Sequence, residues 1–224
     1  MKSNVEETRL SLVVSYMNLR KMIGILGFVF PIILVIGSVI AGGQEQIQNS
    51  ISYYYHTNMR DVFVGVLCVV ALFLFSYRGY DRIDNIAGNI ACFLALGVAF
   101  FPTAHHDPTL ITNPIIGKIH LISASLFFLV LTYFSLFLFT KSDPSKKPSK
   151  QKKNRNKVFR VCGYIMLGCI ITMVIYIAVL KKKFPVLQDY NLVFWFETIA
   201  LFAFGISWLT KGQLILQDLK KTNS

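Results

Sequence analysis

The stretch that decides the fold is residues 192–210, LVFWFETIALFAFGISWLT, in which Glu197 is the single ionisable residue. A helix rises by about 1.5 Å per residue, so this stretch is long enough to cross the ~30 Å hydrocarbon core of a bilayer. Trp195 and Trp208, near its two ends, are expected as anchors at the membrane–water interfaces. We therefore predict a transmembrane helix here, with one carboxyl group inside it.

Five other apolar runs have the same character. The six predicted spans are Ile23–Gly42, Asp61–Tyr77, Asn85–Phe101, Pro114–Thr140, Val161–Leu180 and Leu192–Thr210. The fourth is predicted to begin at Pro114, because Asn113 is a favoured N-cap residue and proline is favoured at the first helical position. The predicted fold is all-α. It is a single domain, residues 1–224, built as a membrane bundle of six transmembrane helices.

The composition agrees with a membrane protein. Hydrophobic residues make up 54% of the 224 residues and charged residues 15%, whereas soluble domains carry about a quarter charged residues. The first apolar run is too long for a signal-peptide core and no small-residue cleavage site follows it, so we expect no cleavable signal peptide. The net charge of +12 does not indicate a nucleic-acid partner, because most of the basic residues lie in short loops on one face.

Lysine and arginine are divided unevenly between the two faces of the predicted bundle. One face collects 18 of the 23, and the other collects Arg60, Lys118 and Lys181–Lys183. Because cytoplasmic loops carry an excess of Lys and Arg, this bias places both termini in the cytoplasm. The Lys181–Lys183 cluster is the one discordant feature.

The segment 141–157 is predicted to be a disordered cytoplasmic loop. It contains SDPSKKPSK (residues 142–150) and almost no apolar residue to bury. Its positive charge predicts attraction to anionic membrane lipids.

All four histidines lie on the face opposite the termini, and histidine is the commonest metal ligand. They are His56, His105, His106 and His120. His120 lies near the start of a span, where a helix N-terminus favours the neutral, metal-binding form. His105 and His106 are adjacent, so at most one is expected to join a shared site. The alternatives are an interfacial His120 bonded to a loop carbonyl and a solvated loop at 105–106.

Glu197 lies about five residues into the sixth span. An ionisable group inside a span usually faces a partner or a polar cavity. One interpretation is a metal ligand or a proton-transfer group. The other is a buried carboxyl that forms a structural hydrogen bond.

The segment SYYYHTNMRD, residues 52–61, is unusually polar and aromatic. Ser52 and His56 are four residues apart and would share a face of a helix. Asp61 follows nearby as a candidate base. Asn58 and Asp61 also fit the start of a helix without any chemistry, and the three tyrosines fit an interfacial aromatic belt.

Four strings resemble a family of small bacterial multi-pass membrane proteins. They are LRKMIG (19–24), YYHTNMRDVFVG (54–65), YRGY (77–80) and FGISWLTKG (204–212). The resemblance implies a multi-pass protein of the bacterial inner membrane. That family has no assigned activity, so the resemblance implies no reaction.

A second resemblance rests on Ser52-x-x-x-His56 with Asp61 nearby. It is similar to a motif of the alkaline ceramidase and adiponectin-receptor superfamily, which are seven-helix, zinc-dependent amide hydrolases acting on lipids. In that superfamily two metal-binding histidines come from an H-x-x-x-H pair in the last helix. This chain has no histidine after His120. Glu197, with His105, His106 or His120, would have to supply the remaining ligands.

Two functions follow as hypotheses. The first is a zinc-dependent hydrolase acting on a lipid or lipid-linked substrate from the outer leaflet. Its metal ligands would be His56, His120 and one of His105 or His106, because zinc held by three protein ligands lowers the pKa of a bound water to about 7. Its catalytic groups would be Asp61, Glu197 and Ser52.

The second hypothesis is a non-catalytic membrane carrier, sensor or scaffold. Glu197 would then be a protonation site or a structural contact. A b-type haem protein is a third interpretation. It would need two axial histidines from facing helices, and His120 alone lies clearly within a span.

Overall fold

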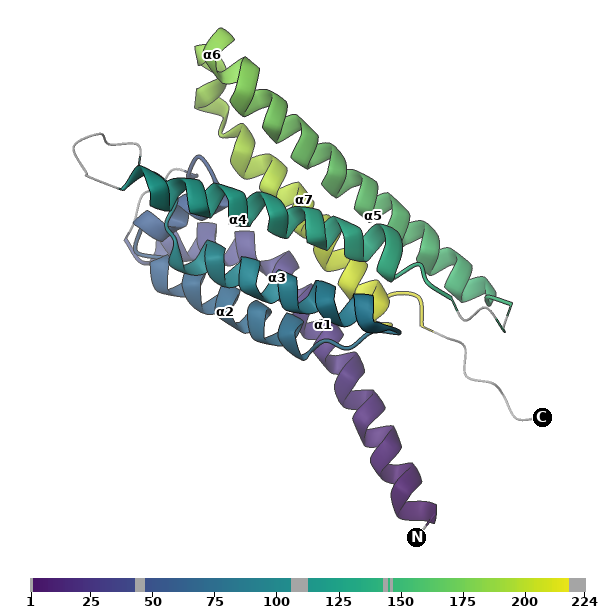
Figure 1. Ribbon diagram of the computed structural model, residues 1–224. Coiled ribbons are helices and arrows are strands. Elements are labelled where there is room, and N and C mark those ends of the chain that lie inside the picture. Colours follow the sequence, from purple (N-terminus) through teal and green to yellow (C-terminus); the bar gives the residue numbers. More distant parts are fainter. Residues whose placement is uncertain (1, 43–46, 106–112, 143–144, 146, 218–224) are drawn as a thin grey trace.

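The described residues of this computed structural model are 2–42, 47–105, 113–142, 145 and 147–217, and they contain helices and loops but no strand. The elements are α1 (Lys2–Ile40), η1 (Ile51–His56), α2 (Arg60–Ser76), α3 (Arg82–Phe100), α4 (Pro114–Tyr133), η2 (Phe134–Leu138), α5 (Lys150–Ile175), η3 (Tyr176–Leu180), α6 (Lys181–Lys183), η4 (Pro185–Tyr190) and α7 (Leu192–Lys211). Each long helix packs against the next one along the chain, and α7 packs back against α1. The contacts between the helices therefore close into a ring, and Figure 1 shows the bundle from the side.

Five helices of the described chain are long and apolar enough to cross a membrane. They are Ser15–Ile40, Arg82–Phe100, Pro114–Leu138, Lys150–Lys183 and Leu192–Lys211. The remaining predicted span corresponds to α2, which has 17 residues and is about 26 Å long. The prediction of an all-α, multi-pass membrane protein is confirmed at this level.

The predicted start of the fourth span is confirmed. Asn113 caps α4, because its side-chain oxygen accepts a hydrogen bond from the Ile115 N–H at 3.0 Å, and Pro114 occupies the first turn. The first helix is longer than predicted, and its first turns extend away from the bundle (Figure 1).

The fifth helix also begins earlier than predicted. Residues 150–157, which were expected to be part of a disordered loop at 141–157, form the first two turns of α5. The Ser149 side chain caps this helix by accepting a hydrogen bond from the Lys152 N–H at 3.1 Å. The prediction is therefore corrected for these residues, because a cap and side-chain contacts stabilise a helix that composition alone does not favour.

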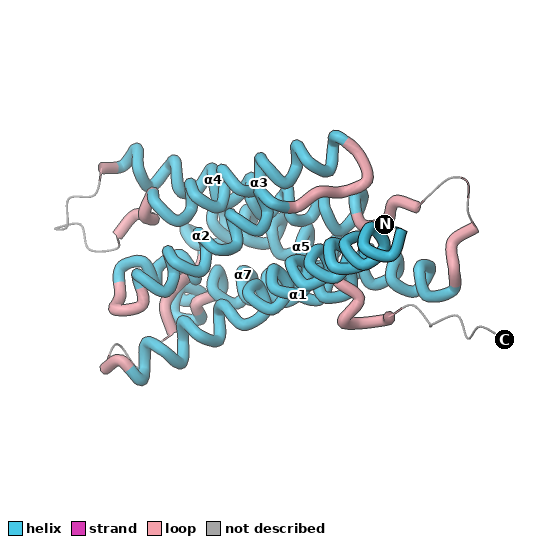
Figure 2. Tube along the Cα trace, turned by 90° about the horizontal axis from the view of Figure 1, so that it is seen from below, coloured by secondary structure: helices cyan, strands magenta, loops and turns pink. Residues whose placement is uncertain are grey.

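Helices α1 and α7 lie side by side (Figure 2), and they approach each other closely at two glycines. A Cβ atom at Gly205 would lie 2.8 Å from the Gly24 carbonyl oxygen, and one at Gly24 would lie 2.8 Å from the Leu209 backbone nitrogen. Both distances are shorter than the closest approach that a Cβ atom makes to another heavy atom. Small residues let transmembrane helices come into backbone contact, so these glycines fix how α7 sits on α1.

An aromatic cluster fills the bundle beside this contact. Trp208 is fully buried. Its ring centroid lies 5.2 Å from that of Tyr77, 5.5 Å from Phe134 and 5.0 Å from Phe139. The expectation that Trp208 is an interface anchor is wrong, because the residue is part of the core. Trp195, by contrast, is 47% exposed.

The two ends of the bundle differ in chemistry. We call the end that carries η1, residues 101–105 and η4 the histidine end, and the end that carries residues 77–81, 141–142, 147–150 and 211–217 the basic end. The start of α1 and residues 212–217 after α7 both lie toward the basic end (Figure 1).

The close contact at Gly205 generates the first prediction. Gly205→Ala should lower the free energy of unfolding by about 1–3 kcal/mol, because a methyl group forced into a packed interface displaces the backbone. The measurement is the thermal unfolding midpoint of the purified protein in detergent. Gly168→Ala on α5 is the matched control, because a Cβ there meets no atom within 4 Å. Equal midpoints for the two variants would contradict the packing role of Gly205.

Candidate functional site

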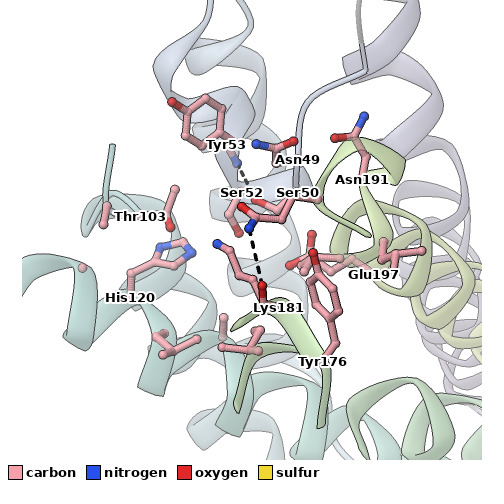
Figure 3. Close-up of a pocket in the computed structure, with 18 of the residues that line it drawn as sticks. Asn49, Ser50, Ser52, Tyr53, Thr103, His120, Tyr176, Lys181, Asn191 and Glu197 are labelled. Atoms are coloured by element: carbon pink, nitrogen blue, oxygen red, sulfur yellow. Dashed lines mark hydrogen bonds between the residues drawn. The ribbon is translucent and has the colours of Figure 1, made fainter. Parts of the chain in front are cut away.

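A cavity of about 730 Å³ lies at the histidine end. Figure 3 shows polar side chains from separate segments pointing into it. Its lining residues come from η1 and the residues before it, from residues 103–105, from α4, and from the segment between η3 and α7. The polar ones are Asn49, Ser50, Ser52, Tyr53, Thr103, His105, His120, Tyr176, Lys181, Gln188, Asn191 and Glu197.

Glu197 links α7 to η1. It is 9% exposed, and one carboxylate oxygen accepts a hydrogen bond from the Ile51 N–H at 2.6 Å. A second hydrogen bond joins the start of α7 to the residues before η1, because the Phe194 N–H donates to the Asn49 carbonyl oxygen at 3.1 Å. Within the described part of the chain Glu197 has this single hydrogen bond. Its second oxygen is therefore available to the cavity that it lines.

His120 lies on the opposite wall, on α4. It is 4% exposed, and its Nδ1 donates a hydrogen bond to the Phe101 carbonyl oxygen at 2.6 Å. This bond requires the hydrogen on Nδ1, so a neutral ring carries its lone pair on Nε2. The ring and the Ser52 side chain both lie at the cavity (Figure 3). The expected carbonyl bond is present, and it leaves one nitrogen able to accept a proton or a ligand.

His56 supports the wall of the cavity. Its Nε2 donates to the Thr103 carbonyl oxygen at 2.8 Å, and its ring lies 4.8 Å from the ring of His105, centroid to centroid, nearly edge-on. Burial lowers the pKa of His56, and the neighbouring His105 and Arg60 add to this effect. His56 is therefore neutral at pH 7. It holds the 101–105 segment against η1, while His105 itself lines the cavity.

Two predicted site residues, Asp61 and His56, do not line the cavity. Asp61 lies exposed in the first turn of α2, and it does not line the cavity. Its position matches the structural role of an acidic residue at a helix start. Asn58 does not cap α2 and instead donates to the Ala41 carbonyl oxygen at 3.0 Å. His106 lies outside the described residues.

Several lining residues were not predicted to belong to a site. Lys181 lies in the cavity wall, together with Tyr176 and Asn191 (Figure 3). The signal for Lys181 was present in the sequence, because the Lys181–Lys183 cluster did not fit the charge bias.

The described residues do not supply a complete metal site. Among them, no three His, Cys, Asp or Glu side chains are arranged to hold a metal ion. His56 and His120 each use one ring nitrogen for a backbone carbonyl. A three-ligand zinc site would therefore need a residue outside the described segments, and His106 is the histidine there.

No protein-family model, no curated protein and no solved structure matches this chain. The fold and the cavity define a multi-pass helical membrane protein with a polar chamber at one end of its bundle.

The bond between Glu197 and η1 generates the second prediction. Glu197→Ala leaves the buried Ile51 N–H without an acceptor, so it should lower the free energy of unfolding by about 1–3 kcal/mol. Glu197→Gln keeps a carbonyl oxygen at this position and should cost less than the alanine variant. Thermal unfolding of the purified proteins measures both, with Asp61→Ala as an exposed control. If the Ala and Gln variants lost equal stability, the hydrogen bond would not be the reason.

Proposed function

We propose that the chain crosses the bacterial inner membrane six times, with both termini in the cytoplasm. Two observations support the proposal. Helix α2 packs against both α1 and α3, so it has the place in the ring that a spanning helix would take. The basic end carries Lys141, Lys152, Arg155 and Lys211, as cytoplasmic loops do.

A reporter that is active only outside the cytoplasm tests this arrangement. Fused after Ser224 it should be inactive, and inserted at Gln46 it should be active, because the 18-to-5 division of basic residues places these points on opposite faces. Strong activity from the C-terminal fusion would reverse the orientation.

We propose that the cavity at the histidine end binds the polar end of a lipid or a lipid-linked molecule. The observation that carries the proposal is that exposed apolar residues line the cavity beside its polar groups. Leu121 on α4 and Ile177 on η3 line the cavity and are 54% and 43% exposed. Acyl chains could then remain in the bilayer while the polar group reaches Glu197, His120 and Lys181.

The polar lining suits a headgroup with several functional groups. Lys181 supplies a cation, Glu197 a carboxyl oxygen and His120 an imidazole nitrogen, and Tyr53 and Tyr176 supply hydroxyl groups. Pockets that bind small molecules combine apolar walls with a few placed polar groups in this way.

A membrane hydrolase is the second candidate. The observation that favours it is that Ser52, His120 and Glu197, three residues predicted to act together, line one cavity. His120 with a free Nε2 and Glu197 with a free oxygen are both suited to accept a proton from an attacking hydroxyl or water. The resemblance to zinc-dependent amide hydrolases supports the same proposal. A zinc-dependent hydrolase would require His106 to complete the set of metal ligands.

Photoreactive lipid labelling tests the binding proposal. A lipid analogue with the reactive group near its head should label peptides that contain Tyr53, Leu121 or Tyr176 in the wild type. Ala124→Phe fills the cavity wall and should remove most of this labelling. Ile122→Phe is the matched control, because Ile122 is on the same helix and 59% exposed to the surroundings. Equal labelling of both variants would contradict a site in the cavity.

The same purified proteins separate binding from hydrolysis. A hydrolase should release product from the analogue, and Ser52→Ala, His120→Ala or Glu197→Gln should lower the rate by about 10²-fold or more. The zinc form also requires about one metal ion per chain, lost in His56→Ala and His120→Ala. Labelling without product or metal would support the non-catalytic carrier or sensor.

A further inference from the structure

A second, smaller cavity lies at the basic end, between α1, α5 and α7. It has a volume of about 80 Å³ and is lined by Arg20, Tyr80, Lys152, Arg155, Phe159, Lys211 and Gln213. Four of these seven side chains are cations, and none of the described lining residues is acidic. Like charges gathered from three helices repel one another, so a bound anion would stabilise the arrangement.

Lys211 is the least compensated of these cations. It is 9% exposed, and its Nζ lies 5.1 Å from the ring centroid of Tyr80 and 5.0 Å from that of Phe139. Within the described part of the chain it has no hydrogen bond and no ion pair. Two aromatic faces offset only part of the desolvation of an ammonium group. A buried ammonium of this kind points to a ligand.

Arg20 offers a second donor at the same place. Its guanidinium stacks near Tyr16 and Tyr77, with distances of 5.2 and 5.5 Å to the ring centroids. Its Nε is buried and has no hydrogen-bond acceptor among the described residues. A planar guanidinium beside an ammonium is the donor set that proteins use for phosphate oxygens.

The buried carboxylate at this end does not fill the role of counter-ion. Asp84 is fully buried, but its oxygens bind the Lys141 ammonium at 3.1 Å and the Tyr80 N–H at 2.5 Å. These bonds fix Tyr80, whose ring forms one wall of the cavity. Asp84 therefore shapes the site, and its ion pair is with Lys141 and not with a cation that lines the cavity.

We propose that this cavity binds a phosphate group, held by Lys211, Arg20, Lys152 and Arg155. Its volume of about 80 Å³ is small beside that of the cavity at the histidine end, which suits one tetrahedral anion. The chemistry is shared by inorganic phosphate and by the phosphate of an anionic lipid. Its place at the end of the helices is where lipid phosphates lie, and basic pockets between transmembrane helices recognise such headgroups.

The test uses the full chain, purified in a phosphate-free, uncharged detergent. The unfolding midpoint is measured with inorganic phosphate, with phosphatidylglycerol and with phosphatidylcholine, against chloride at equal ionic strength. Phosphatidylglycerol or inorganic phosphate should raise the midpoint by mass action, and the one that does so identifies the source. Phosphatidylcholine should not, because its cationic choline is repelled by the four basic side chains. An absence of any shift would overturn the proposal.

Variants that each lose one positive charge distinguish binding inside the cavity from general attraction of anions to the basic surface. Lys211→Met and Arg155→Gln should bind the stabilising anion at least about tenfold more weakly, since charge-assisted bonds of this kind contribute about 1.4 kcal/mol or more. Lys153→Gln is the matched control, because Lys153 is exposed on α5 and does not line the cavity. Without anion, Lys211→Met should unfold at the same temperature as the wild type or higher.

An equal loss for Lys153→Gln and Lys211→Met would show nonspecific surface attraction and would overturn the proposal. If Lys211→Met fails to fold, Arg20→Gln replaces it, with the same expected loss and the same contradicting result.

Discussion

The backbone contact between Gly24 on α1 and Gly205 on α7 is the constraint on which the rest of the structure depends. Because no side chain separates the two helices there, α7 is held against the first helix of the chain and closes the ring. Helix α7 also packs along α5. Its two ends then carry the buried ionisable groups, Glu197 at the histidine end and Lys211 at the basic end. Both cavities are therefore positioned by one helix.

The two ends of the bundle are closed by the same kind of contact, a backbone N–H bound to a buried carboxylate. At the histidine end, the segment before α2 turns back over the bundle, and Glu197 receives the N–H of Ile51. At the basic end, Asp84 receives the N–H of Tyr80 while Lys141 bridges Asp81 and Asp84. In both cases a buried carboxylate anchors a loop that forms one wall of a cavity. Glu197 and Lys211 are buried polar groups whose hydrogen-bonding capacity is not fully used, and each lines the cavity at its own end.

Sequence reasoning predicted the helices well and the site in part. Long apolar runs and the Asn113–Pro114 start predict α4 directly, because bilayer thickness and capping are local constraints. Glu197, His120, His105 and Ser52 were predicted together, and they line one cavity. Trp208 was misplaced, because which face of a helix turns inward depends on neighbours that are distant in the sequence. The burial of Asp84 and Lys211 follows from tertiary contacts and has no local signal.

The structural and chemical interpretations of Glu197 are compatible. A carboxylate has two oxygens, and the η1 contact uses one of them. The bond to Ile51 fixes the orientation of the side chain, so the second oxygen points at the cavity without rotational freedom to lose when a ligand arrives. Groups held in this way bind and exchange protons more effectively than mobile ones. The same logic applies to His120, where the bond to the Phe101 carbonyl selects the tautomer that presents Nε2. The backbone bonds that complete the fold thus also prepare the two side chains for a ligand.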